Sequence, residues 1–396
     1  MGELTIISSI GRLFTAGAAG VVENAAVVIR DGTISFAGPE ALLAEHLVGI
    51  RSDGTEVDLK GALVTPGLID AHSHPVYAGN RFAEIAQRSA GASYSQIAAS
   101  GGGIAATVAA TRAASSDSLA SAARHRLRSW LDGGTTTVEA KTGYHLDGPG
   151  EIEAVRILAG LAGEPDLPSI EVTWLAGHGI GPEYGDDGDG YIDEACRWCA
   201  DARSAGARHA DVFCDEGYFT VEQSRRLLTA ASSAGMLPRI HADELARTGG
   251  ARLAAELGCS SADHLLRVEA TDARLLADAG VVATLAPVTA LAMGRRPPVR
   301  ALLEAGVTIA LGSDHNPGTC GTTSMSLVVA LAVAELGLSV HQALEAATAG
   351  GAASLHLADR GRIVAGSRAD IVAWDADHEG AFSWNYGLRP LRIWKA

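Results

Sequence analysis

The stretch Ala62-Leu-Val-Thr-Pro-Gly-Leu-Ile-Asp-Ala-His-Ser-His74 contains the pattern on which the predicted fold depends. An apolar run of β-forming residues leads directly into two histidines, His72 and His74, which are separated by one residue. Side chains alternate between faces along a strand, so both imidazoles are expected to point to the same side of the strand end. Two imidazoles in that position are well placed to chelate one divalent ion. The stretch therefore predicts a strand with a metal site at its carboxyl end.

Seven similar apolar runs follow this strand. They are residues 135–140, 170–175, 210–214, 239–242, 261–265, 281–285 and 307–311. Alanine-rich helical stretches, for example residues 118–131 and 221–234, separate nearly all of them. Strands that alternate with helices are typical of a parallel sheet, and eight of them favour a closed (β/α)8 barrel, the TIM barrel. We predict an α/β fold with this barrel over residues 63–357.

The two ends of the chain differ from the middle because short β-forming runs lie between turns there. The runs are residues 4–7, 26–30, 33–38, 361–364, 369–374 and 391–394. Asp31-Gly32 joins two of these runs, and Asp-Gly between β-forming segments indicates a hairpin. We therefore predict a small β-sandwich domain built from both termini, residues 1–62 plus 358–396.

Composition excludes several classes of partner. The formal charge of −15 argues against nucleic acid or an anionic membrane as the main partner. It leaves a small anionic substrate possible, because one local arginine can outweigh a distant negative surface. No apolar run is long enough for a membrane helix, and no signal peptide is visible, so a cytoplasmic location is expected. Five cysteines have no disulfide spacing, and the Cys196-x-x-Cys199 pair in a helical stretch is interpreted as structural thiols.

Polar residues end several of the predicted strands, where the active sites of such barrels form. His241 ends the fifth strand, His264 the sixth and Asp314 the eighth. Imidazoles together with a carboxylate suit zinc or ferrous iron and leave a position for water. Glu244 lies three residues after His241, where a carboxylate can move a proton between water and a leaving nitrogen. The pattern predicts metal-assisted hydrolysis.

These motifs, in this order, resemble the amidohydrolase superfamily and, within it, the imidazolonepropionase family. The resemblance extends over almost the whole chain. The segments that carry it are residues 67–74, 78–81, 101–104, 136–144, 176–178, 211–214, 241–244, 261–264 and 313–319. It implies hydrolysis of 4-imidazolone-5-propanoate to N-formimino-L-glutamate in histidine degradation, by a homodimer.

The resemblance also implies roles for individual residues. The ligands of one divalent ion, zinc or iron, would be His72, His74, His241 and Asp314, and His264 would stand beside the ion. The substrate would be held by Arg81, Tyr94, Tyr144, His178, Asn316, Gly318 and Thr319. An arginine after the first strand can clamp a carboxylate through two hydrogen bonds, and the turn at residues 316–319 can offer amide groups to an anionic or carbonyl group. Two-metal relatives need a bridging lysine at the end of the fourth strand, and none stands there, so one ion is expected.

In the mechanism that the resemblance implies, Asp314 accepts a proton from the attacking water. His264 stabilises the oxyanion, and Glu244 delivers a proton to the leaving nitrogen. Three departures from the family pattern bear on the substrate: His145, His315 and residues 286–296. Two alternatives remain open, namely a deaminase of a cyclic nucleobase-like or formimino substrate on the same scaffold, and a non-catalytic binding protein.

Overall fold

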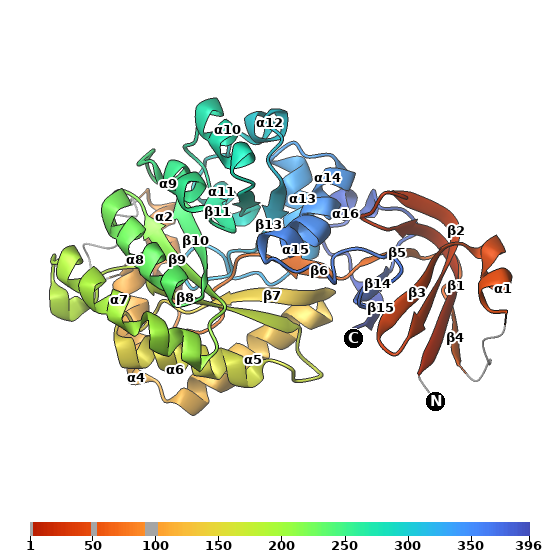
Figure 1. Ribbon diagram of the computed structural model, residues 1–396, viewed down its shortest axis with the longest axis horizontal. Helices are drawn as coiled ribbons and strands as arrows, with labels where there is room; N and C mark the ends of the chain where they lie inside the picture. Colours follow the sequence, from red (N-terminus) through yellow and green to blue (C-terminus); the bar gives the residue numbers. More distant parts are fainter. Residues whose placement is uncertain (1–2, 49–53, 92–101) are drawn as a thin grey trace.

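The computed structural model describes residues 3–48, 54–91 and 102–396. Two sheets organise these residues, as Figure 1 shows. One is an eight-stranded parallel sheet surrounded by helices, and the other is a seven-stranded sheet at the side of the molecule, close to both chain ends. The predicted (β/α)8 barrel with a small extra β domain is confirmed.

The barrel strands are hydrogen-bonded in sequence order. They are β6 (Leu68–Asp70), β7 (Thr135–Lys141), β8 (Ser169–Gly177), β9 (His209–Cys214), β10 (Leu237–Ala242), β11 (Ser261–His264), β12 (Val282–Leu285) and β13 (Ile309–Leu311). The sheet closes because the chain after β6 bonds to the end of β13 and to the chain that follows it. The amide of Ala71 donates to Leu311 O (3.1 Å), and the amide of His74 donates to His315 O (2.8 Å). Every predicted barrel strand has a counterpart.

The helices that cover the barrel form where apolar residues recur at helical spacing and where capping residues mark the helix ends. The main ones are α4 (Gly103–Ala113), α5 (Ser116–Asp132), α6 (Gly148–Leu161), α7 (Gly188–Ala205), α8 (Val221–Ser233), α9 (Gly250–Leu257), α10 (Ala270–Asp278), α12 (Val299–Glu304) and α13 (Met325–Ala334). In α5 the buried residues Leu119, Ala123, Leu127 and Trp130 recur at helical spacing. Helix α8 is preceded by the N-cap residue Thr220, whose side chain forms a capping box with Gln223.

The small domain is built around one mixed sheet with strands from both ends of the chain. Its order is β15-β14-β5-β1-β2-β3, with β4 paired to β1. The strands are β1 (Leu4–Phe14), β2 (Val21–Arg30), β3 (Thr33–Pro39), β4 (Thr55–Asp58), β5 (Leu63–Pro66), β14 (Ile371–Trp374) and β15 (Pro390–Trp394). The predicted hairpin at Asp31-Gly32 forms, with both residues at positive φ. The strand predicted at residues 361–364 is wrong, because that segment forms bends outside the sheet.

Gly67 marks the point at which the stretch of residues 62–74 passes from the small sheet to the barrel. Residues before it form β5 in the small sheet, and residues after it form β6 in the barrel. A Cβ at position 67 would lie 2.1 Å from Oγ1 of Thr136, so only glycine allows the chain to pass so close to β7. Gly312 has a similar role, because a Cβ there would lie 2.5 Å from Cβ of His72. These two glycines let the first and last barrel strands approach their neighbours closely.

Several shorter elements complete the described chain. They are η1 (Glu40–Leu42), α1 (Leu43–His46), α2 (Phe82–Ser89), η2 (Pro182–Tyr184), α11 (Pro287–Ala292), α14 (Val340–Glu345), η3 (Ala346–Gly350), α15 (Gly351–Ser354) and α16 (Ala381–Trp384). No helix of the described segments has both the length and the apolar character needed to cross a bilayer. The cysteines are free thiols, and Cys199 is buried in α7.

Candidate active site

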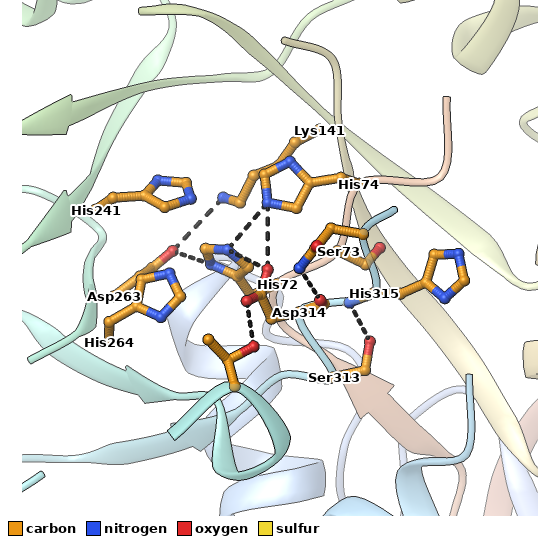
Figure 2. Close-up of polar contacts among 12 residues, drawn as sticks. His72, Ser73, His74, Lys141, His241, Asp263, His264, Ser313, Asp314 and His315 are labelled. Atoms are coloured by element: carbon orange, nitrogen blue, oxygen red, sulfur yellow. Dashed lines mark hydrogen bonds and ion pairs between the residues drawn. The ribbon is translucent and has the colours of Figure 1, made fainter. Parts of the chain in front are cut away.

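Four histidines and one aspartate meet at the carboxyl end of the barrel strands. His72 and His74 follow β6, His241 lies in β10, His264 ends β11 and Asp314 follows β13. All five side chains are buried, and Figure 2 shows them grouped around one point. The predicted convergence of these residues is therefore present in the structure.

The atoms of three of these side chains are spaced as metal ligands are. Nε2 of His72 lies 3.3 Å from Nε2 of His74. Oδ1 of Asp314 lies 3.5 Å from the first nitrogen and 3.4 Å from the second. In a tetrahedral zinc site with bonds of about 2.0–2.1 Å, neighbouring ligand atoms stand about 3.3–3.4 Å apart. The donor atoms therefore fit a divalent ion without rearrangement.

A second group shares His72. His72, His241 and His264 also have ligand atoms within 4.8 Å of one another. The ring centroids of His241 and His264 lie 4.6 Å and 4.9 Å from that of His72. The geometry thus brings both His241 and His264 to the centre, where either imidazole is close enough to be the further ligand.

The backbone at the centre is strained. His264 has a φ of 71° and Asp314 a φ of 51°, in the left-handed region that residues with a side chain rarely adopt. Such strain persists only where the surrounding structure holds it, and it concentrates at functional sites. Both residues are thus held in place by the barrel rather than by local preference.

Burial keeps several imidazoles neutral. It lowers the pKa of His72 and His178 well below the ordinary value, and that of His264 to about 4. Burial alone would raise the pKa of Asp314, but the hydrogen bond with His74 and the nearby imidazoles outweigh it and lower that pKa well below its usual range. The neutral imidazole of His72 and the ionised carboxylate of Asp314 are thus in the forms in which such side chains bind metal.

Glu244 is held beside His264, with Oε2 3.8 Å from Nε2 of that residue. Burial and the nearby Asp314 carboxylate raise the pKa of Glu244 to about 8, so it carries a proton at neutral pH. The carboxylate of Asp215 fixes the backbone of this segment, accepting hydrogen bonds from the amides of Glu244 (2.7 Å) and Leu245 (2.8 Å). A buried carboxylic acid in this position can donate a proton.

A cavity of about 380 Å³ opens above the centre. The predicted site residues that line it are His74, Arg81, Tyr144, His178, His241, Glu244, His264, Asp314, Asn316 and Thr319. It is also lined by Ile104, Phe213, Tyr218, Leu245, Ala292 and Met293, which the sequence did not single out as site residues. The size suits a small molecule, and the lining combines apolar walls with a few polar groups, as ligand sites do.

Arg81 lies at the cavity with a buried partner. Its Nε and Nη2 donate to the carboxylate of Glu84 at 2.7–2.9 Å, and both side chains are buried. Gly318 leaves room for it, because a Cβ at that position would lie 2.4 Å from Nη1 of Arg81. A side chain at position 318 would therefore require the guanidinium of Arg81 to shift. Glu84 was not identified from the sequence.

Hydrogen bonds within the turn at residues 316–319 occupy its backbone amides. Oδ1 of Asn316 accepts hydrogen bonds from the amides of Gly318 and Thr319, both at 2.8 Å. Those two amides are therefore engaged within the turn, contrary to the expectation that they are offered to a ligand. The side chains of Asn316 and Thr319 still line the cavity. Tyr94 lies outside the described residues.

Tyr144 and His178 stand over the histidine cluster. The ring of His178 is stacked on that of His74, with centroids 5.1 Å apart and planes at 19°. Its Nδ1 lies 3.0 Å from the carbonyl oxygen of Gly143 and donates to it. The ring of Tyr144 lies 5.1 Å from His178 and 6.0 Å from His74. Both predicted substrate residues are thus at the cavity wall.

Sequence reasoning missed a group of buried charged residues beneath the centre, namely Glu139, Lys141, Asp211, Arg239 and Asp263. The alternation along the strands could have found them, because Asp211, Arg239 and Asp263 occupy positions two residues from other inward-facing side chains. It also missed Thr289 of α11, whose hydroxyl donates to Oδ2 of Asp314 at 2.5 Å. No sequence feature marks Thr289.

Known proteins resemble this chain over nearly its full length. An imidazolonepropionase from Anaeromyxobacter sp. (strain K) is 42% identical over 375 residues, which covers 93% of this chain and 88% of that protein. The imidazolonepropionase of Porphyromonas gingivalis is also 42% identical, over 92% of this chain and 86% of that protein. The chain belongs to the imidazolonepropionase family. Residues 219–393 also match the broader Amidohydrolase family.

The fold of this imidazolonepropionase family member is shared more widely. An adenosine deaminase from Xanthomonas campestris superposes with a TM-score of 0.70 at 19% identity, covering 99% of this chain and 91% of that structure. Ochratoxinase from A. niger gives 0.69 at 22% identity, covering 100% and 94%. At this level of identity the likeness concerns the fold alone.

Two of the three departures from the imidazolonepropionase pattern lie away from the cavity. The ring of His145 packs against Gly150, where a Cβ would lie 2.5 Å from it. The ring of His315 has Nε2 3.2 Å from the hydroxyl of Tyr77 and Nδ1 3.2 Å from the carbonyl oxygen of Thr322. Neither is among the described residues that line the cavity, whereas Ala292 and Met293 of the third departure are. Of the three departures, residues 286–296 are therefore the one that contributes side chains to the described cavity lining.

Proposed function

We propose that this chain hydrolyses the ring amide of 4-imidazolone-5-propanoate and produces N-formimino-L-glutamate, a step of histidine degradation. Its relatives are named imidazolonepropionases. The observation that carries the proposal is one cavity with three kinds of group: a metal-type cluster, a protonated Glu244 and the guanidinium of Arg81. The substrate has a ring carbonyl and a carboxylate, which need these groups.

In this proposal His72, His74, His241 and Asp314 hold one divalent ion, zinc or iron. Three imidazoles with one carboxylate suit either metal. The 3.3–3.5 Å spacing of the ligand atoms of His72, His74 and Asp314 supports the assignment. When bound, the ion supplies Lewis acidity and lowers the pKa of water.

The protein side chains then have separate tasks. Asp314 accepts a proton from the attacking water. His264, neutral because burial lowers its pKa to about 4, donates a hydrogen bond to the oxygen that gains negative charge. Glu244, protonated at neutral pH, delivers a proton to the ring nitrogen as the C–N bond breaks.

The remaining cavity residues orient the substrate. Arg81 pairs with the propanoate carboxylate, for which a guanidinium is suited. Tyr144, His178 and Thr319 contact the ring from the cavity wall, with Asn316 and Gly318 shaping the turn beside it. Tyr94 joins this set as a substrate residue by resemblance.

The direct test is incubation of the purified protein with 4-imidazolone-5-propanoate while its ultraviolet absorbance is followed. Loss of that absorbance with formation of formiminoglutamate, and without ammonia, is the expected result. A matched control is the variant His72→Ala, which should be inactive. Release of ammonia from a cyclic amidine or aminopyrimidine, with no reaction of imidazolone propanoate, would contradict the proposal and favour a deaminase.

Two further parts of the proposal concern the protein in the cell. We place it in the cytoplasm, in keeping with its free cysteines. We also expect a homodimer, on the basis of the family resemblance. Light scattering of the purified protein tests the second point, because a monomer mass would contradict it.

A further inference from the structure

Five charged side chains lie beneath the histidine cluster with no exposed surface. They are Glu139 and Lys141 of β7, Asp211 of β9, Arg239 of β10 and Asp263 of β11. Burying so many charges is costly unless each is paired, and an apolar interior could fill the same space. The arrangement therefore calls for an explanation beyond fold stability.

Asp263 contacts an imidazole of the proposed metal centre directly. Its Oδ2 lies 2.7 Å from Nδ1 of His72, as Figure 2 shows. Because the carboxylate accepts, Nδ1 carries the hydrogen, and Nε2 keeps its lone pair. That Nε2 faces Nε2 of His74 at 3.3 Å, across the centre.

Asp211 lies beside the imidazole of His241 at ion-pair distance. Its Oδ2 lies 3.0 Å from Nδ1 of His241. Its Oδ1 accepts hydrogen bonds from the amides of Val212 (2.7 Å) and His241 (3.2 Å). The carboxylate is thus anchored to the backbone on one side and faces the imidazole with the other oxygen.

Lys141 links the two carboxylates. Its Nζ lies 2.7 Å from Oδ2 of Asp211 and 3.5 Å from Oδ2 of Asp263. Arg239 approaches Asp263 Oδ2 from another side, at 3.4 Å. Ser261 donates to the remaining oxygen of Asp263 at 2.6 Å. Each carboxylate therefore has partners that fix its orientation.

We propose that Asp263 and Asp211 are positioning residues that fix the tautomer and ring orientation of His72 and His241, and that Lys141 holds both carboxylates in place. The inference rests on the proposed function, because it requires the centre to bind a divalent ion. Carboxylates that orient ligand histidines commonly alter metal affinity or activity by about 10–100-fold when removed. Lys141 acts through these carboxylates.

The same network supplies a matched control. Glu139 is as buried as Asp263 and lies 2.8 Å from Nζ of Lys141. Its other side-chain contacts are with Thr173, with the amide of Ser73 and, at 3.6 Å, with Nε of Arg239. Glu139→Gln therefore removes one carboxylate from the network without removing a contact to either imidazole.

The experiment measures the zinc dissociation constant of the full-length protein by competition with a chelator. Asp263→Asn and Asp211→Asn should weaken zinc binding about 10–100-fold, and Glu139→Gln by less than about threefold. The ligand-field spectrum of the Co²⁺-substituted protein should change in the two aspartate variants and stay unchanged in Glu139→Gln. Ser261→Ala, which keeps every charge, should weaken zinc binding about 2–10-fold.

The outcomes separate this inference from the proposed function. Wild-type protein that binds no zinc or iron would overturn the proposed function. Wild-type protein that binds zinc, with equal losses in Asp263→Asn, Asp211→Asn and Glu139→Gln, would overturn only the positioning role. If the aspartate variants do not fold, Ser261→Ala decides, because unchanged zinc affinity and spectrum there would contradict the role of Asp263.

Discussion

The hydroxyl of Thr289 lies 2.5 Å from Oδ2 of Asp314 and donates to it, while Oδ1 of the same carboxylate faces His72 and His74. Thr289 belongs to α11, which follows the seventh barrel strand. The segment that departs from the family pattern therefore also orients the carboxylate at the centre of the site.

Thr289→Val should lower kcat about 10-fold or more, because a hydrogen bond to a charged group contributes about 1.5–3 kcal/mol. Valine keeps the shape of threonine, so the fold should be retained. The control is Thr284→Val, because among the described residues the buried hydroxyl of Thr284 has no hydrogen-bond partner. Steady-state kinetics of both variants check the prediction, and equal kcat in Thr289→Val and wild type would contradict it.

Glu244→Gln should lower kcat about 10²–10⁴-fold and leave the metal content unchanged, because a proton donor is lost and no proposed ligand is altered. The pKa of Glu244 is raised to about 8, so its proton is present below that pH and lost above it. We therefore expect wild-type kcat to fall as pH rises past about 8. The exposed Glu216→Gln is the control, and a Glu244→Gln variant of normal kcat would exclude the role.

Arg81→Ala should raise KM for imidazolone propanoate about 10–100-fold with a smaller change in kcat, because it removes a charge-assisted contact to the substrate carboxylate. Arg300, which is exposed and pairs with Glu304, provides the control variant Arg300→Ala. Initial-rate measurements over a range of substrate concentrations test this. An unchanged KM in Arg81→Ala would remove the proposed role of Arg81.

Glu379 should make the protein sensitive to acid. The hydrogen bond from Arg12 is the main cause that lowers its pKa to about 2, from an ordinary value of 4.5. Its stabilising contribution is complete above pH 4.5 and is lost as the pH falls towards 2. Glu379→Gln should lower the unfolding temperature at pH 7, and the difference from wild type should shrink below pH 4.5. A difference that is constant over pH 2–7 would contradict this linkage.

Much of the fold could be predicted because apolar runs and helical spacing are local features of the chain. The runs at residues 210–214 and 239–242 became β9 (His209–Cys214) and β10 (Leu237–Ala242) with small shifts at their ends. The strand predicted at residues 361–364 does not form, because β-forming residues make a strand only where a neighbouring strand is available. Its Ile363 is buried in the small domain, but its amide bonds to Thr15 outside a ladder.

The candidate site was predicted where one side chain marks a strand end, as at His241 and Asp314. It was not predicted where a role depends on contacts between strands. Asp263 precedes His264 in sequence, yet its partner is His72, 191 positions away. Glu84 likewise matters through Arg81 and the glycine at position 318, which only the folded chain brings together.

The most direct test of the account is removal and return of the metal. Protein that has been dialysed against a strong chelator should lose hydrolysis of imidazolone propanoate. Added zinc or iron should restore it, with activity reaching a plateau at one ion per chain as measured by elemental analysis. Demetallated protein that still hydrolyses the substrate at the full rate would contradict the account.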